Sequence, residues 1–104
     1  MKSMRWALTI VTAAAPWVAA HAQPTPVQVR SLAANCAQCH GTDGRPPPGS
    51  ILPALAGRPE AELTASLLAY KAGSMPSTVM TQLAKGFTDA QLRMLAAHFA
   101  AQPK

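Results

Sequence analysis

The sequence has few residues that could build a metal site from protein ligands alone: two cysteines and three histidines among 104 residues. A structural zinc site needs four ligands, commonly as two pairs of Cys or His. A thioredoxin-like site would place Cys36 and Cys39 in a βαβ unit, which this Ala-, Leu- and Pro-rich chain does not show. A disulfide closing so small a loop would add little stability. These absences argue against a zinc, thioredoxin-like or purely structural pair of cysteines.

Charged residues are also scarce, at 12% of the chain, and the nine Lys and Arg residues form no block. Proteins that bind nucleic acid concentrate basic residues in runs or on one face. We therefore predict no nucleic-acid partner. The main apolar stretch, residues 6–19, is short for a bilayer crossing and contains Pro16. No stable membrane span is expected after processing of the N-terminus.

The N-terminal stretch has the pattern of an export signal. Residues 1–5 are short and basic, residues 6–19 are apolar, and residues 20–22 form an A-x-A cleavage pattern. The sequence thus predicts a cleaved signal peptide over residues 1–22, a single domain over residues 23–104 and a location in the bacterial periplasm. An uncleaved anchor is the alternative interpretation.

The two cysteines belong to the sequence C-x-x-C-H at residues 36–40, the attachment pattern of a c-type haem. Two intervening residues place the sulfurs about one helical turn apart, so that each thiol can add to one vinyl group of the porphyrin. The following imidazole lies beneath the iron. We therefore predict one covalent haem c on Cys36 and Cys39, with His40 as an axial ligand. A haem would also add the apolar body that so short a domain lacks.

The rest of the chain predicts a small all-α fold, with three to four helices wrapped around the haem. Helices are expected over residues 27–39, 60–72, 77–85 and 89–102. Gly41 is expected to end the first helix in a left-handed cap. Thr88 and Gln91 have the spacing of a capping box at the start of the last helix. The core stripe of that helix is expected to comprise Leu92, Leu95, Ala96 and Phe99.

Residues 42–59 contain too many prolines and glycines for a helix, and so long a loop in a small domain is explained if it wraps the haem. Its apolar part, residues 51–57, is expected to cover one face of the porphyrin. Pro53 lacks an N–H but has a free carbonyl. We expect this carbonyl to accept a hydrogen bond from the imidazole of His40, which would fix the ring.

Four side chains are candidates for the second axial ligand: Met75, Met80, Met94 and His98. Met94 and His98 lie in the last predicted helix, whose apolar face has a structural explanation. His98 is interpreted as a surface or rim histidine. Met80 is the preferred ligand, and Met75 is the alternative.

Several segments resemble class I c-type cytochromes of the cytochrome c4/c553 type: CAQCHGTDG at residues 36–44, PALAG at 53–57 and LAAHF at 95–99. Three more are similar to the haem subunit of flavocytochrome c sulfide dehydrogenase: YKAG at 70–73, STVM at 77–80 and LAKGF at 83–87. By this resemblance Met80 corresponds to the family's axial methionine, and Pro53 to the proline that bonds the haem histidine.

The resemblance implies an electron carrier with no catalytic residues of its own, because iron bound by both His40 and Met80 has no open position for a substrate. It implies two partners, an FAD-containing subunit of a sulfide dehydrogenase and a downstream electron acceptor. The chain has one C-x-x-C-H, whereas the best-known subunits of that kind carry two haem domains. A free soluble cytochrome serving an oxidase or another dehydrogenase is one alternative. A haem enzyme or gas sensor with a labile sixth site is another.

Overall fold

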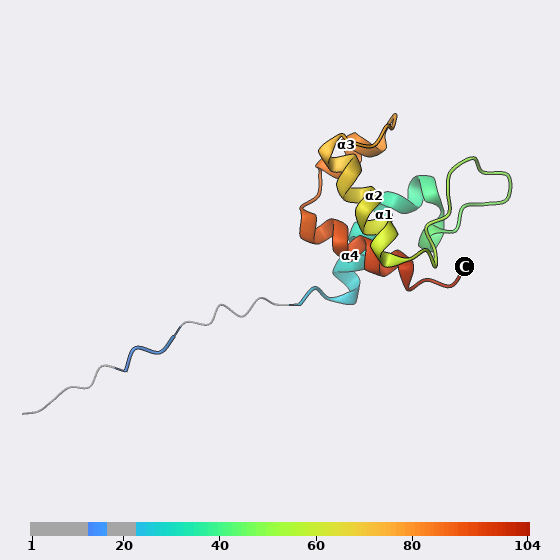
Figure 1. The fold of residues 1–104 in the computed structure, drawn as a ribbon. Helices are drawn as coiled ribbons and strands as arrows, with labels where there is room; N and C mark the ends of the chain where they lie inside the picture. Colours follow the sequence, from blue (N-terminus) through green and yellow to red (C-terminus); the bar gives the residue numbers. More distant parts are fainter. Residues whose placement is uncertain (1–12, 17–22) are drawn as a thin grey trace, which may run out of the picture.

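The computed structural model describes residues 13–16 and 23–104. Its elements are α1 (Pro26–His40), the 3-10 helix η1 (Thr42–Gly44), α2 (Glu60–Ala72), α3 (Met80–Lys85) and α4 (Asp89–Ala100). The four α-helices are gathered around one centre (Figure 1), and no strand occurs within the described ranges. The predicted all-α class is confirmed. Apart from residues 13–16, the predicted signal peptide of residues 1–22 lies outside the described residues.

Helix α1 begins at a capping box that was not predicted. The Thr25 hydroxyl accepts a hydrogen bond from the backbone N–H of Gln28 at 3.3 Å, and the Gln28 side chain accepts one from the backbone N–H of Thr25 at 2.8 Å. The T-x-x-Q spacing was the available signal. The helix runs through His40, one residue further than predicted. Both cysteines and the histidine are therefore held by one helix.

Gly41 ends α1, but not in the predicted left-handed cap. Its φ of 84° and ψ of 162° lie in a region that is essentially restricted to glycine. A Cβ at this position would clash with the backbone carbonyl of Arg45 and lie 2.6 Å from the Cα of Pro46. Arg45 and Pro46 thus pass through the space that a side chain at Gly41 would fill.

The other helix boundaries follow the predicted signals with two shifts. Gly73 ends α2 in a left-handed cap, with φ 76° and ψ 12°. The capping box of α4 is present, because the Thr88 hydroxyl accepts from the Gln91 N–H at 3.1 Å and the Gln91 side chain accepts from the Thr88 N–H at 2.9 Å. Helix α4 ends at Ala100, two residues early, and α3 begins at Met80 instead of residue 77.

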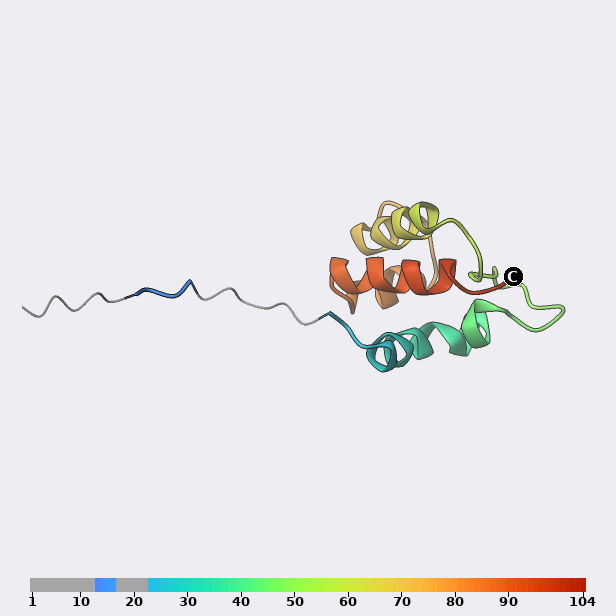
Figure 2. The same ribbon diagram turned by 90° about the horizontal axis from the view of Figure 1, so that it is seen from below.

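Helix α4 forms the centre of the core. Its predicted stripe is buried, with Leu92, Leu95, Ala96 and Phe99 each at most 3% exposed. Figure 2 shows α4 lying between α1 and α2, and α3 packs against α2. Lys71 at the end of α2 donates a 2.8 Å hydrogen bond to Asp89 at the start of α4, and this contact lowers the pKa of Asp89.

No helix in the described part of the chain is long and apolar enough to cross a membrane.

Candidate haem site

A cavity of about 570 Å³ opens between the end of α1, the loop after η1, and the helices α2, α3 and α4. This volume lies within the range of about 300–1,000 Å³ that is typical of pockets for organic ligands. Most of the lining is aliphatic or aromatic: Leu55, Leu63, Leu67, Leu83, Leu95 and Phe99 are among its residues. Such a lining suits a flat apolar ring.

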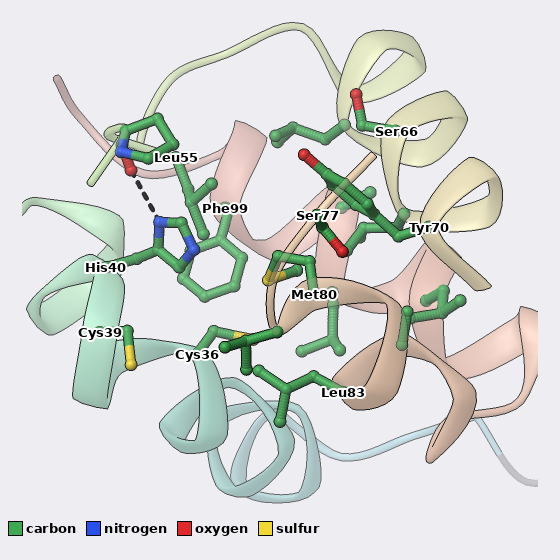
Figure 3. Close-up of a pocket in the computed structure, with 18 of the residues that line it drawn as sticks. Cys36, Cys39, His40, Leu55, Ser66, Tyr70, Ser77, Met80, Leu83 and Phe99 are labelled. Carbon is green, nitrogen blue, oxygen red and sulfur yellow. Dashed lines mark hydrogen bonds between the residues drawn. The ribbon is translucent and has the colours of Figure 1, made fainter. Parts of the chain in front are cut away.

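The C-terminal end of α1 brings the whole C-x-x-C-H sequence to the edge of this cavity. Cys36, Cys39 and His40 all line it, and Figure 3 shows the three side chains together on the last turn of the helix. Both cysteines are free thiols, with Cys36 half-buried and Cys39 exposed. Burial raises the pKa of the Cys36 thiol and so favours its protonated form. Because both thiols are unpaired and line the cavity, both could form a bond to a ligand in it.

The imidazole of His40 is oriented by the loop. His40 is 8% exposed, and its Nδ1 lies 2.7 Å from the carbonyl oxygen of Pro53. A carbonyl can only accept, so the ring donates from Nδ1, and Nε2 takes no part in this hydrogen bond. The ring enters the cavity beside Phe99, as Figure 3 shows. The hydrogen bond expected at Pro53 is therefore present, and it leaves Nε2 as the ring nitrogen that could bind a metal ion.

The opposite wall carries methionine sulfur. Met80, the first residue of α3, lines the cavity, and Figure 3 shows its side chain directed toward His40 across the open space. Met75 lines the same cavity from the loop between α2 and α3. Met94 and His98 are instead placed in a separate groove beside Pro24 and Arg30. The structure thus brings both methionine candidates to the site and does not bring Met94 or His98 there.

The loop of residues 42–59 closes one end of the cavity, but only part of it does so. Leu55 donates a backbone hydrogen bond to the Gly44 carbonyl at 2.8 Å, and Gly57 donates one to the Phe99 carbonyl at 3.0 Å. Leu52, Pro53 and Leu55 line the cavity. Ile51 is 97% exposed, so the predicted cover of residues 51–57 is wrong at its first residue. The cover consists of Leu52, Pro53 and Leu55.

Several polar residues of the lining were not predicted: Arg58, Ser66, Tyr70 and Ser77. Ser66 and Tyr70 lie four residues apart on α2, and with Leu63 and Leu67 they share one helical face. That spacing was a readable signal. Arg58 forms an ion pair with Glu62. It lies in a loop, where no periodic pattern predicts which way a side chain points. Its place in the lining could not be read from the sequence.

The residues present fit a covalently bound haem. Two thiols and an imidazole share the end of one helix, an apolar cavity adjoins them, and a thioether is directed toward the imidazole from the far wall. Thioether and imidazole are the ligand pair found in many c-type cytochromes. Zinc would instead require further cysteine, histidine or carboxylate ligands.

Comparison with known proteins agrees with this geometry. Residues 28–101 match the family model named cytochrome c. The cytochrome subunit of sulfide dehydrogenase from Chlorobaculum tepidum is 38% identical over 68 residues, which are 65% of this chain and 60% of that protein. The thiosulfate dehydrogenase electron acceptor from Thiomonas intermedia is 37% identical over 67 residues, which are 64% of this chain and 31% of that protein.

A third relative is covered over more of its own length. Cytochrome c-554(548) from Halomonas halodenitrificans is 34% identical over 70 residues, which cover 83% of that protein. The chain thus covers less than two thirds of the first two relatives but most of the third. The family match spans α1 to α4 and includes the C-x-x-C-H sequence. The chain belongs to the cytochrome c family, and its cofactor is covalently attached haem c.

Proposed function

We propose that this cytochrome carries electrons between redox proteins, with haem c joined to Cys36 and Cys39 and with His40 and Met80 as the axial ligands. The observation that carries the proposal is the position of the Met80 thioether across one apolar cavity from His40. Haem supplies a reversible one-electron change at iron. With both axial positions filled by protein side chains, no site is left for a substrate, so the protein acts as a carrier.

The residues around the ligands have defined tasks in this proposal. The Pro53 carbonyl accepts the Nδ1 proton of His40, which fixes the ring and makes Nε2 a stronger donor. With haem bound, the thioether of Met80 would favour the ferrous state, and the apolar lining would limit the access of water. The thioether ligand and the exclusion of water would each raise the reduction potential of the haem. Pro53 holds His40 through its backbone, so its contribution does not depend on a titratable side chain.

Reaction with carbon monoxide tests this function against that of a gas sensor or haem enzyme. The ferrous protein is mixed with carbon monoxide in a stopped-flow instrument, and the Soret absorption is followed. We expect little or slow binding, because carbon monoxide must first displace Met80. Rapid and complete binding would show a labile sixth site and would contradict the carrier function.

Attachment of the haem can be tested with the two cysteines separately. Cys36→Ala and Cys39→Ala should each leave at most one thioether bond, and the double variant should leave none. We also expect poor folding of the products, because the cavity of about 570 Å³ adjoins the core. Haem staining after denaturing electrophoresis measures the covalent fraction. Full staining of the double variant would overturn the attachment at these residues.

We propose a sulfide-oxidising flavoprotein with FAD as the electron donor, and a further redox protein as the acceptor. The similarity to the cytochrome subunit of sulfide dehydrogenase supports this partner. Affinity purification from the native host, followed by a flavin assay of the eluate, tests it. Co-elution of an FAD protein that reduces the cytochrome when sulfide is added is the expected result. Failure of such a flavoprotein to reduce the cytochrome would contradict it.

A free soluble carrier serving an oxidase or another dehydrogenase is the second candidate. It is favoured by the likeness to cytochrome c-554(548), because the aligned region covers 83% of that protein.

The proposed location of either form is the bacterial periplasm, after cleavage of residues 1–22. N-terminal sequencing of the protein from a periplasmic extract should begin at Gln23. A chain retained in the membrane with residues 1–22 attached would support an uncleaved anchor instead.

A further inference from the structure

Two hydroxyl side chains form a clamp around the start of α3. The Ser77 hydroxyl oxygen accepts a hydrogen bond from the backbone N–H of Thr81 at 2.9 Å. The same oxygen lies 2.8 Å from the hydroxyl oxygen of Thr81, so the two side chains share a second hydrogen bond. Met80 lies between these two residues in the sequence. The clamp therefore encloses the backbone that carries the proposed sulfur ligand.

This clamp takes the place of an ordinary helix cap. The N-cap residue of α3 is Val79, which has no side-chain oxygen and makes no capping hydrogen bond. Helix α3 has only six residues, and so short a helix has little stability of its own. Ser77 lies two residues before Val79 and satisfies the free Thr81 N–H of the first turn. Loss of the Ser77 hydroxyl would therefore release the first turn of α3, where Met80 is located.

The direction of Met80 depends on this turn. Ser77 and Met80 both line the cavity, and Figure 3 shows them next to each other on the wall opposite His40. Met80 is half-buried, and Val79 beside it is 54% exposed. Apolar packing of these two side chains therefore fixes the first turn of α3 only in part. The two hydrogen bonds between Ser77 and Thr81 add to the backbone hydrogen bonds that the Val79 carbonyl accepts from Gln82 and Leu83.

We propose that Ser77 is a positioning residue for the sixth ligand, because its clamp on Thr81 holds the Met80 thioether toward the iron. This inference rests on the proposed ligation by Met80. It predicts that Ser77 controls how readily an external ligand displaces the methionine. The clamp stabilises the state in which Met80 is bound to the iron. Its loss should therefore favour any external ligand that competes with Met80 for the iron.

Imidazole is a suitable probe, because it replaces a thioether on ferric haem. It is titrated into the ferric holoprotein while the absorption band from thioether-to-iron charge transfer is followed. Ser77→Ala should bind imidazole about fivefold more tightly than wild type, which corresponds to about 1 kcal/mol, the usual size of a capping contact. Ser77→Thr keeps the hydroxyl and should retain most of the wild-type affinity.

Thr88→Ala is the matched control. Thr88 caps the twelve-residue helix α4 through one hydroxyl, at 3.1 Å from the Gln91 nitrogen, but it does not line the cavity. Its loss should lower global stability without changing imidazole affinity. Equal increases in affinity for Thr88→Ala and Ser77→Ala would reduce the effect to general destabilisation and overturn the inference.

The same titration separates this inference from the ligation on which it rests. If wild type shows the thioether band and Met80→Ala loses it, Met80 is the ligand. An unchanged imidazole affinity in Ser77→Ala would then overturn the role of Ser77 alone. If Met80→Ala keeps the band, the proposed ligation itself fails.

Discussion

Met80→Ala should abolish the thioether-to-iron charge-transfer band of the ferric protein and lower its reduction potential substantially. Met80 is the first residue of α3, and its side chain is directed toward His40 across the cavity. A thioether stabilises ferrous iron, and axial ligands together set haem potentials over about 0.8 V. Replacement by alanine leaves water or an external ligand at the iron. We therefore expect a large fall in potential and rapid binding of carbon monoxide by the ferrous variant.

Met75→Ala is the decisive comparison, because Met75 lines the same cavity. It keeps Met80 in place and should leave the band and the potential close to those of wild type. Absorption spectra and redox titrations of the two variants under identical conditions separate the two methionines. Loss of the band in Met75→Ala, with its retention in Met80→Ala, would assign the sixth ligand to Met75.

Gly41→Ala should prevent stable folding around the haem. Gly41 has φ 84° and ψ 162°, where a side chain costs about 1–3 kcal/mol in backbone strain. An added Cβ would also overlap the Arg45 carbonyl, a backbone atom that cannot rotate away. The clash adds to the strain and bears directly on His40, the preceding residue. We expect a large fall in the urea midpoint and a low yield of holoprotein.

Gly49→Ala separates the clash from the strain. Gly49 has the same φ of 84°, but an added Cβ there would meet nothing within 4 Å. Its replacement should cost only about 1–2 kcal/mol, the usual penalty of a left-handed conformation for a residue with a side chain. Urea unfolding of both variants, followed by circular dichroism, measures the difference. Equal urea midpoints would show that the close approach of Arg45 to Gly41 has no energetic importance.

The features that could be predicted from the sequence are those with local signals. The apolar spacing of Leu92, Leu95 and Phe99 indicated a buried face of α4, and this face forms the centre of the core. The Thr88–Gln91 spacing indicated a capping box, which is present. The three functional side chains of the C-x-x-C-H sequence lie close together because they are neighbours along one helix. These patterns need no knowledge of distant contacts.

The features that could not be predicted depend on contacts between distant or unpatterned residues. The conformation of Gly41 is imposed by the chain at Arg45, which folds back over it. The start of α3 at Met80 is accompanied by the Ser77 clamp, a side-chain contact with no periodic signal. The exposure of Ile51 reflects the path of a proline-rich loop. In each case the conformation depends on features that leave no periodic pattern in the sequence.

The absorption spectrum of the ferric wild-type holoprotein tests the central claim most directly. If His40 and Met80 both bind the iron, the spectrum will be that of a low-spin, six-coordinate haem with the thioether-to-iron charge-transfer band. A high-spin, five-coordinate spectrum without that band would show an open position at the iron. That result would contradict the ligation by Met80 and the function as a simple electron carrier.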